Sequence, residues 1–548
     1  MSLFGVSSGL ALCASSDSLP RFVRGAERMR GRTCRAFSRR TAAATTACFA
    51  ALLFFTPQTR GEAWLDAGDS GLRSDIQYLV DTGAIEIMLT GWPIPSADVA
   101  WAIEGIKKPE DLSSGQLAAL NRVKTHLGVF RSDALRITAY TAVAGNPIVL
   151  RTFDDTPREN VEIGGTLSDS GERFAGRLAV QWVHDPADGQ SFRLDGTYGS
   201  MRLGNWLLTA GALDRWWGPG WDGSLILSSN ARPVPAIALD RESSKAFESP
   251  WLSWIGPWRL STFMGRMEEH RQDIDHPLLY GMRISFRPFG NIHFGSVHPL
   301  RGFEFSVERT AQWCGEGLPC NFDAFWNMLR GHDNEGENVK PEDEPGNQLA
   351  GWSLRWASPW KSLPIAWYRQ KTGETIDEHS PLPRRTLDIY GAETWGSTAS
   401  GVGWRVHAEY ADTACSHREG ETEPFWDCAY DSALFDVEGY RYRGHPLGHS
   451  IDGDGLSYTL GMQVTTPSRR SAWLLLRYAE LNRGGVVPDT RNTVAQEPTD
   501  DWGFEFGAAV PSGRSDLKLG LGFDHATDQI TQDVSQTVHG FLQYTYRF

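Results

Sequence analysis

The sequence lacks any apolar run long enough to cross a membrane as a helix. The longest run, Thr41–Thr56, falls well short of the ~20 residues that such a helix needs. An excess of basic residues is also absent, because 53 Lys and Arg stand against 67 Asp and Glu. So acidic a chain is a poor partner for phosphates, which excludes nucleic acid. The negative mean hydropathy still allows a membrane barrel, since only alternate residues of its strands are apolar.

Cysteine is scarce. Three of the seven lie within residues 1–63, and the other four form two local pairs, Cys314 with Cys320 and Cys415 with Cys428, in stretches that read as loops. We predict two disulfides, each stapling one loop in an oxidising compartment. A metal site is the alternative, but the close Cys-x-x-Cys spacing is missing. We therefore expect no metal and no cofactor.

Residues 1–63 have the composition of an export signal. Eight arginines within the first 40 residues precede the apolar run, and the small-residue stretch Gly61-Glu62-Ala63 follows it. This order predicts a secretory signal peptide. Met29 would begin a leader of ordinary length, which makes residues 1–28 an over-called start; a genuine N-terminal extension is the alternative. Residues 1–63 hold nine of the 53 basic and three of the 67 acidic residues, so 44 basic and 64 acidic residues leave residues 64–548 with a net charge of −20.

Residues 64–131 show helical periodicity. Apolar residues from Leu72 to Val80 fall on one face, and Ser96, then Ser113 or Ser114, are placed to cap two further helices. The last helix is expected to turn Leu117, Leu120 and Leu127 inward. The pattern predicts a small α-helical bundle over residues 64–131.

From residue 132 the period is two. Apolar and polar residues alternate most clearly in Phe174–Asp185, Leu278–Arg287, Val402–Ala411 and Val538–Phe548. These segments have the ~10-residue length of tilted membrane strands, and aromatics lie near their ends. We predict a membrane all-β fold over residues 132–548, a large antiparallel transmembrane β-barrel with an even number of strands between about 16 and 20. The alternative, a soluble sandwich or propeller, should have shorter strands and polar outer faces.

Three long irregular stretches interrupt this pattern. They are Trp217–Pro250, Cys314–Asn347 and Ala411–Asp454, and we predict extracellular loops there. Short turns such as Pro511–Gly513 are expected on the periplasmic side.

Four stretches resemble the capsule assembly Wzi family. They are Leu72–Leu79 with Thr90–Pro95; Asp214–Gly220; Ser228–Pro233 with Phe247; and Tyr440–Gly444 with Gly448–Ser450 and Asp452. The resemblance implies an 18-stranded barrel in the outer membrane of a Gram-negative bacterium, with a periplasmic helical bundle. It also implies a lectin-like role, holding capsular polysaccharide or exopolysaccharide at the cell surface. The long leader and the loop cysteines depart from the family pattern but touch none of these motifs.

Seven residues are candidates for polysaccharide binding. Indole faces stack on sugar rings, and charged groups bind hydroxyls or acidic sugars, often in bidentate fashion. On these grounds the candidates are Asp214, Arg215, Trp216, Trp217, Trp221, Arg232 and Arg241. The alternative is structural: the tryptophans form a girdle or plug, and the arginines form lumen salt bridges with Asp214, Asp240 or Glu242.

Two further motifs have simpler explanations. In Gly448–Gly455, adjacent His, Ser and Asp residues do not make a catalytic triad, which depends on geometry, and the Ca²⁺-loop spacing is incomplete. A turn rich in Gly and Asp accounts for it. The acidic runs at 333–337 and 342–344 are expected to be solvated loop, with divalent-ion binding between polysaccharide chains as the alternative.

The predicted function is polysaccharide attachment without catalysis, by a monomer in contact with outer-membrane lipid. A diffusion porin with an aqueous lumen is the second hypothesis. An enzyme acting on lipid or glycan is the third, and neither a nucleophile motif nor a metal spacing supports it.

Overall fold

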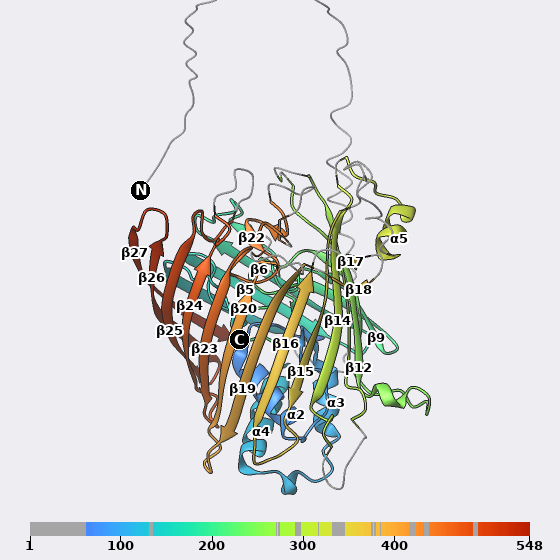
Figure 1. Ribbon diagram of the computed structural model, residues 1–548. Helices are drawn as coiled ribbons and strands as arrows, with labels where there is room; N and C mark the ends of the chain where they lie inside the picture. The colour runs from blue at the N-terminus through green and yellow to red at the C-terminus, as the bar shows by residue number, and fades with distance from the viewer. Residues whose placement is uncertain are drawn as a thin grey trace, which may run out of the picture. The chain divides into compact units, whose positions relative to one another are not determined.

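The wall of the protein is a closed antiparallel barrel. Figure 1 shows the computed structural model. β7 and β8 both pair with β6 and share one position, so the wall has eighteen strand positions. β27 pairs with β4 and closes the barrel. The strands of the wall are β4 (Arg136–Gly145), β5 (Val161–Ser170), β6 (Phe174–Val183), β7 (Phe192–Arg193), β8 (Tyr198–Leu203), β9 (Trp206–Gly211), β11 (Ala236–Arg241), β12 (Trp258–Arg266), β13 (Leu278–Phe286), β14 (Phe303–Trp313), β15 (Gly346–Ala357), β16 (Ile365–Gly373), β19 (Thr386–Ser397), β20 (Gly403–Asp412), β23 (Leu456–Thr465), β24 (Ser471–Leu481), β25 (Thr499–Ser512), β26 (Ser515–Asp528) and β27 (Val534–Arg547).

The structure describes residues 62–548 with gaps. The gaps are 131–134, 270, 272–273, 291–297, 316, 331–345, 374–375, 378–379, 384, 416–423, 425, 429, 432–437 and 486–491. The predicted leader therefore lies outside the described residues, apart from its last two. These two residues, Glu62 and Ala63, are buried in the folded part of the protein. The predicted leader, residues 1–63, therefore overlaps the folded part at its last two residues. Among the described residues, no helix is both long and apolar enough to span a bilayer.

The two faces of the wall differ as the alternation predicts. On β20, Arg405 and Glu409 point inward and are buried, whereas Ile284 of β13 and Val307 of β14 point outward and are 37% and 49% exposed. An apolar exterior around a polar interior is the pattern of a membrane barrel, not of a soluble sandwich. The predicted fold class is confirmed.

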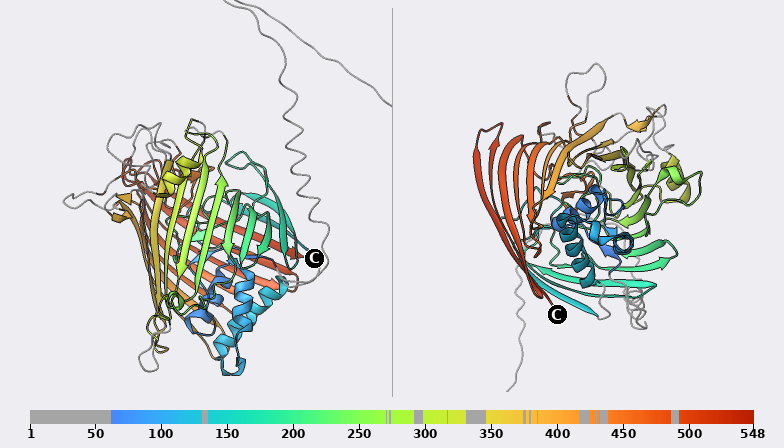
Figure 2. Two further views of the ribbon diagram at one scale, coloured as in Figure 1. Left: turned by 90° about the vertical axis from the view of Figure 1, so that its right-hand side faces the viewer. Right: turned by 90° about the horizontal axis from the view of Figure 1, so that it is seen from below.

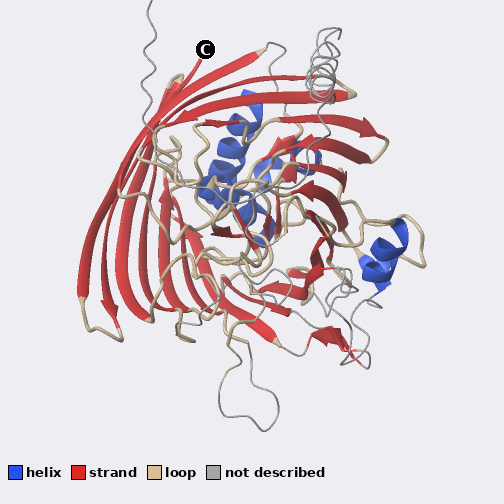
Figure 3. Ribbon diagram, turned by 90° about the horizontal axis from the view of Figure 1, so that it is seen from above, coloured by secondary structure: helices blue, strands red, loops and turns tan. Residues whose placement is uncertain are grey.

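Three N-terminal helices enter the ring of strands (Figure 3). They are α2 (Ser70–Asp81), α3 (Ser96–Glu104) and α4 (Ser114–Phe130). The short strand β1 (Trp64–Leu65) precedes them, and β2 (Gly91–Trp92), β3 (Ile94–Pro95) and η2 (Pro109–Asp111) lie between them. Asp69 caps α2 by accepting from the Leu72 N–H at 2.8 Å. Ser113 and Gln116 cap α4 reciprocally, as predicted.

Two details of the predicted bundle are wrong. Ser96 does not cap α3, because its hydroxyl donates to the Glu62 carbonyl while Pro95 holds the cap position. Leu117 is 43% exposed, although Leu120 and Leu127 are buried as predicted. The bundle supplies most of one hydrophobic core, which Phe153 and Trp216 complete. Its members from the bundle include Leu65, Ile76, Leu79, Trp92, Ile94, Val99 and Leu120.

The ends of the barrel are distinguished by what fills them. At one end of the barrel, α4 meets the β19–β20 turn, where Arg122 donates to the Gly401 carbonyl at 3.3 Å. We call this the helical end; the N-terminal helices lie there (Figure 2, left). The opposite end, the loop end, receives the long connections. Between β14 and β15 the connection contains α5 (Phe322–Arg330), which packs outside the wall with Phe325 against Tyr280, the ring centroids being 5.4 Å apart. The connection between β20 and β23 contains β21 (Arg441–Tyr442) and β22 (His445–Pro446), and β17 (Ile376–Asp377) pairs with β18 (Ser380–Pro383) between β16 and β19.

The predicted loop Trp217–Pro250 is wrong in two respects. Residues 236–241 form a wall strand, β11, which pairs with both β9 and β12. Residues 212–235 leave the wall at the loop end and turn inward, so that nearly all of them are buried. Pro511–Gly513 does lie at a tight strand connection, between β25 and β26, as predicted.

Candidate functional site: the packed lumen

The segment Asp214–Trp221 lies inside the barrel. Within it, β10 (Trp216–Trp217) pairs with β2 of the N-terminal region, Trp216 opposite Trp92. The tryptophans Trp216, Trp217 and Trp221 are only 1%, 3% and 5% exposed. The indole N–H of Trp216 donates to the Gly220 carbonyl at 3.2 Å. The motif therefore joins the helical region to the connection that enters from the loop end.

Trp221 is the centre of this junction. Its indole N–H donates to Glu393 Oε2 of β19 at 3.0 Å, and its ring stacks on His407 of β20 with centroids 5.6 Å apart. The guanidinium of Arg73, from α2, lies over the same ring at 4.1 Å. Burial lowers the pKa of Arg73 to about 10, which leaves it fully charged at neutral pH. One indole thus contacts a helix and two wall strands.

A charge network behind Trp221 fixes α2 to the wall. Arg355 donates to Asp81 of α2 at 2.7 Å and to Glu393 at 2.7 Å. Arg405 donates to the other oxygen of Glu393 at 2.6 Å. Gln77 of α2 adds a bond of 2.7 Å to the same carboxylate. Buried charges are tolerated only when paired in this way, so the network specifies where α2 sits.

The carboxylate of Glu409 on β20 binds backbone N–H groups of residues 212–235, the inward segment. It accepts from the N–H groups of Trp221 at 2.8 Å and Gly223 at 2.9 Å, and from the Tyr368 hydroxyl at 2.8 Å. A Cβ on Gly223 would lie 2.0 Å from the His449 ring, so only glycine fits here. The wall thereby fixes the turn that follows Trp221.

Asp222, Glu409 and His449 converge closely enough to hold a metal ion. The protonation of His449 argues against that use. Its Nδ1 accepts from the Ile451 N–H at 3.3 Å, so Nε2 carries the ring proton and neither ring nitrogen has a free lone pair for a metal. Asp222 already accepts from Arg477 at 2.5 Å and Thr459 at 3.0 Å. Burial lowers the pKa of His449 to about 4, which keeps the ring neutral.

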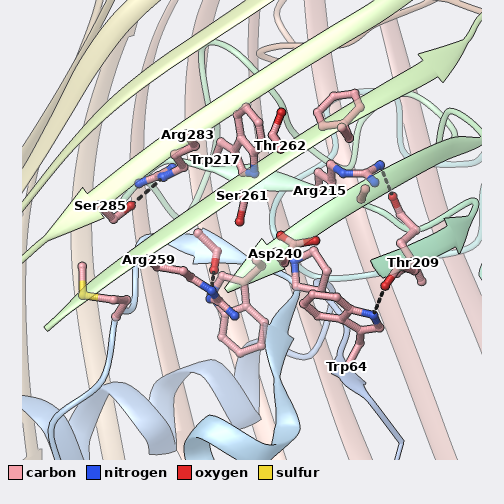
Figure 4. A pocket seen from close by; sticks show the side chains of 17 residues that line it. Trp64, Thr209, Arg215, Trp217, Asp240, Arg259, Ser261, Thr262, Arg283 and Ser285 are labelled. Carbon is pink, nitrogen blue, oxygen red and sulfur yellow. Dashed lines mark hydrogen bonds between the residues drawn. The ribbon is translucent and has the colours of Figure 1, made fainter. Parts of the chain in front are cut away.

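Arg215 and Trp217 line a small cavity between the N-terminal region and the wall (Figure 4). Arg215 extends over the Phe263 ring, with 4.2 Å to its centroid, and Asp240 faces the same space. The cavity measures about 20 Å³, which suits one or two water molecules and not a sugar ring. Asp214 lies 3.9 Å from Arg158, and burial raises the pKa of its carboxyl to about 7.

Arg232 and Arg241 have protein partners already. Arg232 donates to Asp195 at 2.7 Å and to Asp188 at 2.5 Å, and not to the predicted Asp240 or Glu242. Arg241 is the last residue of β11; it lies 3.9 Å from the Trp258 ring centroid and donates to the Trp258 and Lys245 carbonyls. Glu242 pairs instead with Arg202.

The motif at Tyr440–Asp452 packs against the inward segment. The hydroxyls of Tyr430 and Tyr440 donate to the Leu225 and Ile226 carbonyls at 2.6 and 2.8 Å. Arg441 donates to both oxygens of Asp452, at 2.9 and 2.6 Å. Both oxygens of Asp452 accept from Arg441, and His449 Nδ1 accepts from the Ile451 N–H instead of contacting Asp452. Asp452 therefore belongs to neither a catalytic triad nor a calcium loop. The turn interpretation accounts for the motif.

Both predicted disulfides are present. Cys314 bonds to Cys320, and Cys415 bonds to Cys428. The second is fully buried in the core that the connections form inside the lumen, together with Trp217, Leu225, Ile226, Tyr430, Tyr440 and Leu447. The acidic runs at 333–337 and 342–344 lie outside the described residues.

Reasoning from the sequence missed the residues that organise the lumen. Arg405 and Glu409 belong to the polar face of a predicted strand, but their partners Asp81, Trp221 and Tyr368 lie far away in the chain. Apolar/polar alternation along a strand indicates which charged side chains point inward. It does not indicate which residues those side chains contact across the lumen.

Comparison with known proteins agrees with this architecture. The model of the family described as capsule assembly protein Wzi matches residues 136–538. An uncharacterized 55.8 kDa protein in the cps region of Klebsiella pneumoniae is 30% identical over 426 residues, covering 77% of this chain and 78% of the relative. The chain belongs to the Wzi family.

A solved Wzi structure supports the fold. It is that of the Escherichia coli Wzi outer membrane protein involved in group 1 capsule assembly, described as a carbohydrate-binding β-barrel. The TM-score is 0.74 at 24% identity, with 88% of this chain and 99% of that one covered. Wzi membership and the closed barrel make this chain an outer-membrane protein of a Gram-negative bacterium.

Proposed function

We propose that this protein attaches capsular or other surface polysaccharide to the cell, by binding it at the loop end and without catalysing a reaction. The helical end then faces the periplasm. One observation carries the proposal: the connections that enter from the loop end are buried together in one core inside the lumen. A barrel filled in this way is a rigid mount for a binding surface. The carbohydrate binding stated for the E. coli Wzi protein is in line with it.

The same packing disfavours the porin hypothesis. A diffusion porin needs an aqueous lumen. In the described part of the chain, the lumen holds α2, the inward segment 212–235 and the motif at 440–452, most of whose residues are buried or half-buried. Low conductance in planar bilayers is therefore expected.

The seven predicted binding residues keep their place in the proposal, with an indirect role. Each of them has a protein partner inside the barrel or at the wall, and the burial of the three tryptophans leaves no indole face open for stacking on sugar. We propose that they hold the connections in a binding-competent shape. Direct contact with sugar then falls to groups nearer the surface of the loop end.

Trp426 is such a group. It is only partly buried, two residues from Cys428, and the guanidinium of Arg483 lies 5.7 Å from its ring centroid. An indole with an adjacent cation suits a sugar ring that bears acidic groups. The disulfide to Cys415 fixes the backbone beside it.

The test compares cell-bound with shed polysaccharide in a deletion strain carrying no protein, wild type, Trp426→Ala or Trp360→Ala. Trp360 is a matched control, 47% exposed but at the helical end. We expect polysaccharide to move from cells to medium in the deletion strain and with Trp426→Ala, at unchanged total, and not with Trp360→Ala. If the deletion leaves both fractions unchanged, attachment is refuted. If the deletion releases polysaccharide but Trp426→Ala retains it as wild type does, attachment stands and this binding site is refuted.

A further inference from the structure

A connection at the helical end exposes an unusual apolar segment. It joins β11 to β12, contains η3 (Ser253–Ile255) and projects from the wall at the lower right of Figure 1. Trp251 is 86% exposed, Leu252 42%, Trp254 48%, and Phe289 from the neighbouring connection 41%. We call Ser249–Trp258 together with Phe289 the aromatic flange. Exposed apolar side chains gathered on one short connection, rather than scattered singly, indicate a partner.

The flange carries no charge. The ten residues from Ser249 to Trp258 include three tryptophans and no Asp, Glu, Lys or Arg, in a chain that is 22% charged. A connection that faced only water would hold about two charged residues at that average. The composition fits a medium that accepts indole rings and excludes charges.

The exposure is built into the fold. The Trp254 and Phe289 rings stack with centroids 5.2 Å apart, and the Phe289 N–H donates to the Trp254 carbonyl at 2.8 Å. Gly256, at φ +67°, lies so close to Arg287 that a Cβ would approach its carbonyl oxygen to 2.1 Å. The aromatic groups are therefore held outward rather than free to fold back.

The flange continues the lipid-facing wall. Trp258 pairs with Phe286 in the barrel register, and Phe286 contacts Phe305 at 5.5 Å between centroids. Phe286 and Phe305 share the outward face of their strands with Ile284 and Val307, which are exposed. The apolar outer wall thus passes without a break into the flange.

We propose that the aromatic flange lies in the headgroup region of the bilayer leaflet at the helical end and fixes the depth and tilt of the barrel there. Tryptophan favours this region, because its ring is apolar and its N–H can still bond to water or lipid. In the orientation proposed above, this is the periplasmic leaflet. The proposal does not depend on polysaccharide binding.

A spin label tests the position directly. The protein, with both disulfides formed, is labelled at Leu252→Cys and reconstituted in phosphatidylcholine nanodiscs. Collision rates with oxygen, which concentrates in lipid, and with a water-soluble nickel chelate are then compared. Leu117→Cys on α4 is the matched control, with 43% exposure against 42%, and Val307→Cys reports the lipid-facing wall.

We expect the oxygen-to-nickel ratio at Leu252→Cys to lie well above that at Leu117→Cys and toward that at Val307→Cys. Trp251→Cys should give the same result, which guards against a local distortion at either site. A ratio equal to that of Leu117→Cys would overturn the proposal. Low collision rates with both reagents and an immobilised spectrum would also overturn it, since a protein would then cover the flange.

Discussion

The indole of Trp221 and the carboxylate of Glu393 are joined by a hydrogen bond of 3.0 Å inside the barrel. Trp221 belongs to a connection that entered from the loop end, and Glu393 belongs to the wall strand that also holds α2 through Arg355 and Gln77. The inward segment, which enters from the loop end, and α2, which enters from the helical end, therefore both bind the carboxylate of Glu393.

Replacing Trp221 should open the lumen. Trp221→Ala removes a buried ring at a cost of about 3–5 kcal/mol and releases Arg73 and Glu393 from it. The wall keeps its own ladder, so we expect the barrel to persist and to conduct ions in planar bilayers more than wild type. Trp360→Ala is the control. Conductance of Trp221→Ala no greater than that of the control would contradict the plug assignment.

Replacing Glu393 should destabilise the protein more than replacing Asp388, a carboxylate of the same strand that faces outward. Glu393→Gln leaves Arg355 and Arg405 short of a buried partner, and breaking buried pairs costs about 3–5 kcal/mol. Asp388→Asn removes the partly exposed pair with Arg369, for which about 0–1 kcal/mol is typical. We expect the temperature at which folded protein disappears on a semi-native gel to fall clearly for the first variant and little for the second.

The connection between β20 and β23 should be more stable in mild acid. Asp454 is 3% exposed, and burial, with a smaller contribution from Asp427 and Asp431, raises the pKa of its carboxyl to about 7 from 3.8. The stability that its protonated form contributes is complete below pH about 4 and is lost as the pH rises through 7. Asp454→Asn, which tolerates the local φ of +55°, should stabilise the protein at pH 8 and leave it unchanged at pH 4.

Thermal midpoints at the two pH values measure this effect. An equal shift at both would show that the substitution acts through packing and not through ionisation. Asp427→Asn, beside the same carboxyl, should give a smaller gain at pH 8.

The buried disulfide should protect its connection from proteases. Replacing Cys415 and Cys428 with Ser removes a 13-residue cross-link, for which about 2–4 kcal/mol is typical. We expect faster cleavage between residues 413 and 455 of the folded protein. The pair Cys314→Ser and Cys320→Ser, with a separation of 6, should leave that region unchanged. Equal cleavage in all three proteins would assign the protection to the surrounding core alone.

Most of the wall could be predicted from the sequence, and little of the lumen. Alternation in Val402–Ala411 identified β20 and its inward residues, because period two is a local property of a strand. Both disulfides followed from short spacings. The inward turn of residues 212–235 could not be predicted, since Gly- and Trp-rich stretches suit a surface loop and a lumen plug alike. Arg232 was paired with the wrong carboxylates for a related reason: Asp188 and Asp195 come from another connection.

The closing seam of the barrel brings the first and last strands of the wall together. β27, the last strand, pairs with β4, the first, from Gly540 opposite Gly145 to Arg547 opposite Thr138. Because this pairing completes the ring, the wall strands that the structure describes leave no unpaired edge on which a second chain could add a strand.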